Sequence, residues 1–157
     1  MKEADRKKRN EDWLSKLYPT FRTGLKKANV LLESSRIRPR IQDGWRSPAD
    51  QKKVYASGHS KLLFGFQNVS AKGGTPEALA VNLLEDDSPL SPSRIYLLQL
   101  AAASEKAGLI TGISWGVPRK LVKAIDQAIT AKYCNTYVKV GWDTTHVQTN
   151  RYYGCRG

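Results

Sequence analysis

Apolar residues recur along the chain at the spacings expected for helices and for short strands. The first helical stripe lies in the highly charged residues 3–18, and a second stripe follows within residues 19–33. We interpret the charged start as a helix that covers the core rather than as an anion-binding arm. The stripes consist of Trp13, Leu14, Leu17 and Tyr18, and then of Phe21, Leu25, Ala28, Leu31 and Leu32.

Proline, serine and glycine signals predict three further helices. Serine followed by proline is typical of an N-cap and a first helical turn, and glycine is typical of a helix end. These signals place helices from residue 48 to Gly58, at 92–107 and at 118–131, with Ser47 and Ser91 as the first two N-caps.

Short strands are predicted between the helices. They cover residues 37–45, 78–84 and 109–115, and a final hairpin or strand pair covers 137–148. Residues 61–75 are rich in glycine and polar side chains and are expected to form a long loop, of the kind that is often functional. Short strands mixed with helices predict an α+β fold, a small and mainly antiparallel sheet flanked by helices.

The length of 157 residues fits one domain, which we divide into a helical segment at 1–34 and a core at 35–150. The net charge of +12 favours an anionic partner or a solvated basic surface, and no nucleic-acid motif accompanies it. The sequence contains no transmembrane stretch and no signal peptide, so we expect a protein that is made in the cytoplasm. We also expect a monomer. Cys134 and Cys155 are expected to be free thiols, unless the tail folds back to join them.

Residues 44–58 read G-W-R-S-P-A-D-Q-K-K-V-Y-A-S-G. This block resembles the G-x-R-[ST]-x-x-[DE]-Q-x-x-L-Y-A-x-G motif of the VanY-like peptidoglycan peptidases. These are zinc D-Ala-D-Ala carboxypeptidases and L-alanyl-D-glutamate endopeptidases, among them many bacteriophage endolysins. Three shorter matches follow in the family's order, at 78–82, 115–116 and 143–148. The resemblance covers roughly residues 35–150 and implies a VanY-like, or hedgehog-like, peptidase fold.

The resemblance also implies roles for individual residues. In this family two histidines and an aspartate bind Zn²⁺, and the metal activates a water molecule. His146 matches the last zinc ligand, Asp143 the general base and Arg46 the arginine that stabilises charge on the scissile carbonyl oxygen. Gln51 and Trp115 match substrate-binding positions. Each of the first three residues also has a structural interpretation. His146 can be a structural histidine, Asp143 a carboxylate in a turn, and Arg46 a member of a structural ion pair.

Two ligand positions depart from the family pattern. Asn82 stands at the aspartate position, and the first histidine position falls on Gln67, or on Thr75 if the family spacing is kept strictly. Amide side chains bind zinc far less well than carboxylate or imidazole, so the substitutions predict weak zinc binding or none.

The function implied by the resemblance is hydrolysis of peptidoglycan stem peptides or crosslinks, as in endolysin-mediated cell-wall lysis. With the zinc site impaired, the chain is either an inactive variant or a pseudoenzyme that kept its groove. The alternative is a non-catalytic protein that binds the cell wall, or another anionic partner, in the same groove. Nucleic-acid binding is a third hypothesis, and it rests on charge alone.

Overall fold

The computed structural model describes residues 1–133 and 137–150, so Cys134 and Cys155 both lie outside the described residues. Within this part of the chain no helix is long and apolar enough to cross a membrane. The helices are α1 (Glu3–Leu14), α2 (Pro19–Ser34), α3 (Pro48–Ala56), α4 (Arg94–Lys106) and α5 (Arg119–Thr130), with a short 3₁₀ turn, η1 (Phe66–Asn68). The strands are β1 (Pro39–Asp43), β2 (Ala80–Glu85), β3 (Leu109–Gly112) and β4 (Asp143–Thr149).

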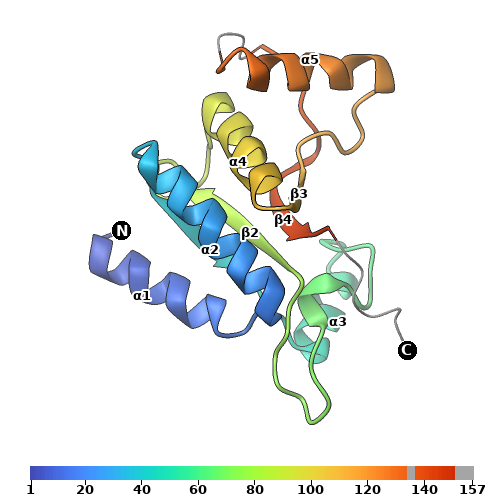
Figure 1. The fold of residues 1–157 in the computed structure, drawn as a ribbon. Coiled ribbons are helices and arrows are strands. Elements are labelled where there is room, and N and C mark those ends of the chain that lie inside the picture. The colour runs from blue at the N-terminus through green and yellow to red at the C-terminus, as the bar shows by residue number, and fades with distance from the viewer. Residues whose placement is uncertain (134–136, 151–157) are drawn as a thin grey trace.

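The four strands form one antiparallel sheet in the order β1-β2-β4-β3. Helices α2 and α4 lie side by side across one face of this sheet (Figure 1). The predicted α+β class, with a small antiparallel sheet flanked by helices, is therefore confirmed. The division of the chain at residues 34 and 35 stays a prediction.

The hydrophobic core lies between the sheet and this pair of helices. Val81 of β2 and Val147 of β4 are directly paired and fully buried, and Leu83 continues the same inward row. The Tyr96 hydroxyl of α4 donates a hydrogen bond of 2.6 Å to the Leu83 carbonyl, and burial raises the pKa of this phenol far above its ordinary value. Since successive strand residues face opposite ways, the residues between these core positions face the other side of the sheet.

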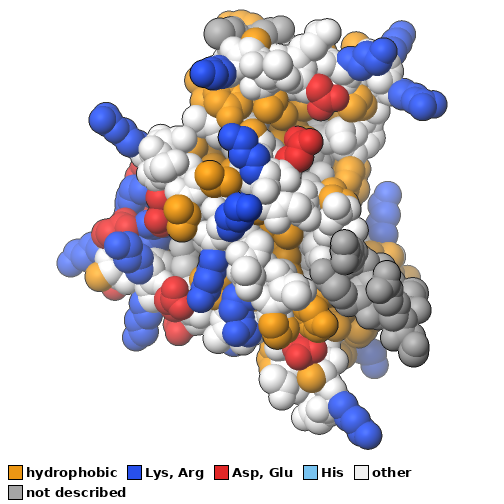
Figure 2. Space-filling model, viewed as in Figure 1, with side chains coloured by type: hydrophobic (Ala, Val, Ile, Leu, Met, Phe, Trp, Pro, Cys, Tyr) orange, Lys and Arg blue, Asp and Glu red, His pale blue; other side chains and the backbone are white. Residues whose placement is uncertain are grey.

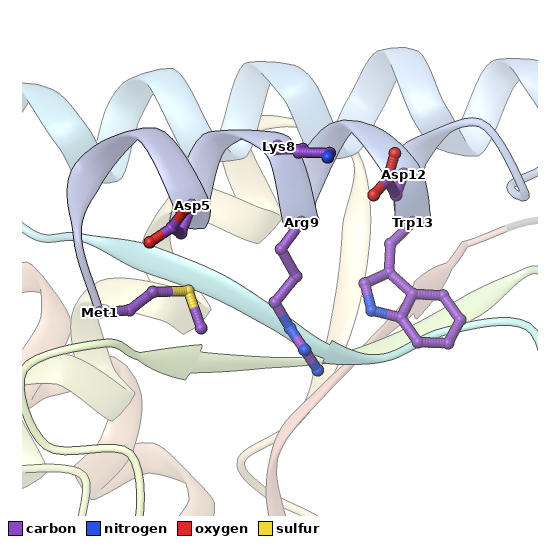
Figure 3. Close-up of a pocket in the computed structure, with 6 residues that line it drawn as sticks. All are labelled: Met1, Asp5, Lys8, Arg9, Asp12 and Trp13. Atoms are coloured by element: carbon purple, nitrogen blue, oxygen red, sulfur yellow. The ribbon is translucent and has the colours of Figure 1, made fainter.

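Helix α1 covers the outer edge of β1 with polar side chains. Arg6 is only 2% exposed, and its guanidinium donates a 2.6 Å hydrogen bond to the Pro39 carbonyl. The buried Asn10 amide donates to the same carbonyl and accepts from the Ile41 N–H, at 3.0 and 2.9 Å. Arg9 extends over β1 and donates to the backbone carbonyls of Ile41 and Gln42 (Figure 3). These side chains take the place of a neighbouring strand and close an edge that would otherwise pair with other chains.

Two predicted elements were placed wrongly. Helix α4 begins at Arg94, two residues later than predicted, because the Ser93 hydroxyl, not that of Ser91, accepts the N-cap hydrogen bond from the Tyr96 N–H. The predicted hairpin at 137–148 is the single strand β4. The preceding segment instead runs beside the turn after β3, where the Gly141 N–H donates to the Ile113 carbonyl.

Candidate functional site

A row of polar residues crosses three strands on the face opposite the core helices. Asn82 of β2 lies directly opposite His146 of β4 on one side and Asp43 of β1 on the other. Directly opposed residues of antiparallel strands share a face, with Cβ atoms about 5 Å apart. A register shift between Ile41 and Asp43 brings the aspartate opposite Asn82. Sequence reasoning missed Asp43, since the shift leaves no mark in the sequence.

His146 is held by two side chains of its own strand. Its Nδ1 lies 3.5 Å from the Asp143 carboxylate, and its Nε2 lies 3.0 Å from Gln148 Oε1. Both ring nitrogens are therefore engaged by side chains of the same strand. His146 can offer Nε2 to a metal only if Gln148 turns away. The predicted pair of Asp143 and His146 is brought together, and the contact with Gln148, the last residue of the 143–148 match, was not expected.

Arg46 links the end of β1 to α3 and η1. Its guanidinium forms an ion pair with Asp43 and donates 2.9 Å to Gln51 Oε1. Its backbone N–H donates to the Gln67 carbonyl, and its own carbonyl accepts from Asn68 Nδ2, both at 2.8 Å. Arg46 is thus connected through Asp43 to the row of Asn82 and His146.

Gln51 is almost completely buried and anchors the following loop. Its Nε2 donates to the Ser60 hydroxyl and to the Leu62 carbonyl, at 3.0 and 2.6 Å, while its Oε1 accepts from Arg46. The observed contacts of Gln51 are therefore internal ones, and its role in substrate binding stays a prediction.

Gln67 lies next to the hydrogen-bonded side chains of Arg46 and Gln51, whereas Thr75 lies in an exposed turn. The Thr75 carbonyl accepts from the Ala71 N–H, and two glycines with positive φ, at 73 and 74, complete the turn. The Nε2 of Gln67 is inaccessible to solvent and makes no hydrogen bond within the described residues. Gln67 and Thr75 are the two positions proposed for the first zinc ligand. Only Gln67 is hydrogen-bonded to Arg46, through its backbone carbonyl.

The donors present do not suit a tightly bound zinc ion. Among residues 1–133 and 137–150, no three His, Cys, Asp or Glu side chains gather closely enough to hold a metal. His59, the other histidine of the sequence, contacts the Ser57 hydroxyl at the end of α3. The other two positions expected to hold ligands carry neutral amides, Asn82 opposite His146 and Gln67 in η1, which bring a dipole where zinc sites use imidazole or carboxylate.

Two tryptophans extend the site beyond His146. The ring centroid of Trp115 lies 5.0 Å from that of His146 and 5.7 Å from that of Trp142, with an interplanar angle of 46° in both pairs. Trp115 was singled out from the sequence, and its contact with His146 places it at the site. Trp142, which directly precedes the strand that carries Asp143 and His146, was given no role of its own from the sequence.

No protein-family model and no curated protein matches the sequence. Among solved structures, the chain is similar to the crystal structure of the Serratia marcescens L-Ala D-Glu endopeptidase ChiX. The two share 20% sequence identity with a TM-score of 0.58, over 90% of this chain and 86% of the other. At this level of identity the likeness shows a shared fold.

Proposed function

We propose that this protein recognises the stem peptide of bacterial peptidoglycan, in a site of the endolysin-type peptidase kind whose zinc centre is impaired. Binding is then the step that the chain has kept, and hydrolysis is the step that the residues at positions 67 and 82 have weakened. The observation that carries the proposal is the pairing of Asn82 with His146 beside Asp143, on a fold shared with an L-Ala D-Glu endopeptidase.

The chemistry of the site suits a short peptide. Arg46 is held at a fixed position by its ion pair with Asp43 and its hydrogen bond to Gln51, and the amides of Asn82 and Gln67 both donate and accept hydrogen bonds, as peptide groups require. By analogy with the structural neighbour, we propose that the segment bound is the L-Ala–D-Glu unit at the start of the stem peptide. Asp143 and His146 would lie against the peptide bond that joins L-Ala to D-Glu.

The overall charge supports attraction to an anionic polymer without assigning a particular surface. Lys and Arg side chains are spread over the face that carries α2 and α4 rather than gathered into one patch (Figure 2). A dispersed charge of this kind raises the local concentration near any polyanion. It therefore favours a protein that first meets the cell wall through charge and then binds the stem peptide in the site.

The metal-binding part of the proposal is tested by restoring the two ligand positions. We expect the double variant Gln67→His/Asn82→Asp to bind about one zinc ion per chain and to clear permeabilised Gram-negative cells. The unchanged chain should do neither. The variant Thr75→His/Asn82→Asp is the matched control, because it places the histidine at the alternative position. A folded double variant that neither binds zinc nor clears the cells contradicts the proposal, as does tight zinc binding by the unchanged chain.

The binding part is tested by sedimentation with purified peptidoglycan at physiological salt, where exposed charges more than about 8 Å apart are largely screened. We expect the unchanged chain to be recovered in the pellet and to be released by soluble stem peptide. Recovery that disappears at physiological salt would mean attraction through charge alone, and it would favour the hypothesis of a general anionic partner.

A further inference from the structure

Trp142 is an exposed aromatic residue fixed at the border of the proposed site. Its side chain is 75% exposed, so it adds little to the core, yet one part of its ring packs on Trp115. Trp115 in turn packs on His146. The three rings form a continuous row that leads from the site to solvent.

The backbone around Trp142 is held in place by the turn after β3. The Trp142 N–H donates to the Trp115 carbonyl at 3.2 Å, and the Gly141 N–H donates to the Ile113 carbonyl at 2.5 Å. Glycine is required beside it, because a Cβ at Gly141 would collide with the backbone of Gly112 and Trp115. At Gly116, where φ is +77°, a Cβ would come within 3.0 Å of the Trp142 ring.

This arrangement differs from that of an ordinary exposed apolar residue. Single apolar side chains on a surface are common and usually have no function. Trp142 differs in two ways. Close packing and two hydrogen bonds hold its backbone, and its ring packs on a second aromatic ring while its outer part stays in water. A group fixed in advance loses less conformational freedom when a ligand packs on it, which is the property of a preorganised binding surface.

We propose that Trp142 is a platform for a sugar ring of the glycan strand that carries the bound stem peptide. The proposal rests on the function proposed above. A pyranose ring presents a flat array of C–H groups that matches the indole face, whereas the first stem residues carry a methyl group and a carboxylate. In peptidoglycan the stem begins on a lactyl group of the sugar, so the L-Ala residue is separated from the ring by that group alone.

The spacing of the rings fits this placement. Trp142 and His146 are separated by one intervening ring, with consecutive centroids 5.7 and 5.0 Å apart. A lactyl group and one residue of extended chain, at up to about 3.5 Å each, cover roughly two thirds of the longest path that these two distances allow. A peptide bond held at His146 would therefore bring its sugar close to Trp142.

The test compares two ligands by isothermal titration calorimetry. One is the disaccharide-bearing stem peptide, and the other is the same stem peptide without sugar. We expect Trp142→Ala to weaken binding of the sugar-bearing ligand by about three- to tenfold, the size of one aromatic contact. Binding of the free peptide should not change. Trp142→Phe should keep most of the affinity, and Leu90→Ala, which removes a fully exposed apolar side chain elsewhere, should have no effect on either ligand.

The outcomes separate this inference from the function on which it rests. Equal losses for both ligands, or no loss for either, would overturn the assignment of Trp142 to a sugar and leave stem-peptide binding in place. An unchanged chain that binds neither ligand would overturn the proposed function, and the inference with it.

Discussion

The sheet carries two clusters of polar side chains, and they differ in how completely their hydrogen bonds are made. At the outer edge of β1, Arg6 and Asn10 of α1 bond to the backbone of Pro39 and Ile41. At the site, the Nε2 of Gln67 in η1 has no hydrogen-bond partner within the described residues. Arg6 and Asn10 therefore have partners for the groups that they direct at β1, whereas Gln67 keeps a shielded donor without one.

The difference indicates which cluster holds the fold and which is suited to a ligand. A buried polar group that loses its partner costs the free energy of its desolvation, so polar groups that stabilise a fold are paired inside the protein. Groups that bind a ligand must keep part of their bonding capacity free. If this interpretation is right, replacing a polar by an apolar side chain should be costly in the first cluster and nearly free of cost in the second.

The largest effect is expected at Arg6. Arg6→Met removes the cation that contacts the carboxylates of Glu3 and Glu33 and the Pro39 carbonyl. These contacts, led by the hydrogen bond with Glu3, raise the pKa of the arginine. We expect the free energy of unfolding to fall by about 2–3 kcal/mol, less than for a fully buried pair because both glutamates are partly exposed. Urea denaturation measures the change.

Lys7→Met is the matched control for Arg6→Met. Lys7 is the next residue of α1, is 67% exposed and contacts Glu3 only at 3.8 Å. Its loss should change stability by less than about 0.5 kcal/mol. Similar losses for the two variants would mean that α1 is held by overall charge and not by the buried contacts of Arg6.

A smaller effect is expected at Asn10. Asn10→Leu leaves the Ile41 N–H without its acceptor, while the Pro39 carbonyl keeps the bond from Arg6. One unpaired buried donor should lower the free energy of unfolding by about 1–2 kcal/mol. Asn10→Asp keeps an acceptor for the Ile41 N–H and should lose less. Equal losses would show that the acceptor is not what makes Asn10 stabilising.

These two residues also show where sequence reasoning fails for the fold. The apolar stripe of Leu14 and Leu17 was predicted, and both residues are buried. Arg6 and Asn10 were given no inward position, because hydrophobic periodicity detects only apolar inward faces. Their burial depends on the edge of β1, which lies some thirty residues further along the chain.

For the site, the sequence was informative where the family motifs supply a residue and silent elsewhere. Asp143 and His146, three residues apart on β4, were predicted and do lie together, and so does Asn82 of the neighbouring strand with His146. Asp43 was missed, and Trp142 was given no role of its own. The place of Asp43 is set by a register shift between two strands, and that of Trp142 by contact with the turn after β3.

The pH dependence of stability at the outer edge of β1 gives a third prediction. The hydrogen bond from Arg6, aided by one from Arg38, lowers the pKa of Glu3 from its ordinary 4.5 to about 2 in the folded chain. A lowered pKa means that the ionised carboxylate stabilises the fold above pH 4.5, and that this contribution is lost as the pH falls toward 2. Since Glu3 is about half exposed, the contribution is below about 1 kcal/mol.

We therefore expect Glu3→Gln to be slightly less stable than the unchanged chain at pH 7 and equally stable near pH 2. Thermal unfolding measured between these values tests the convergence. Glu11→Gln, at an exposed position of the same helix, serves as the control and should show no such trend. A difference that stays constant with pH would mean that the charge of Glu3 is not what stabilises the edge.

The smallest change in stability is expected at Gln67. This change tests whether the polar groups of the proposed site stabilise the fold less than those at the edge of β1. Gln67→Met keeps the length of the side chain and removes an amide whose Nε2 is shielded from solvent and has no partner in the part of the chain that the structure describes. The Gln67 carbonyl still accepts from the Arg46 N–H, so the backbone contact is kept. We expect a change within about 0.5 kcal/mol, or a slight gain in stability, since a buried donor without a partner contributes nothing to the fold. A loss above 1 kcal/mol, comparable to that of Asn10→Leu, would show that the amide is bonded in solution. The Gln67 amide would then resemble that of Asn10, and the proposed stem-peptide site would lose the free donor that Gln67 offers to a ligand.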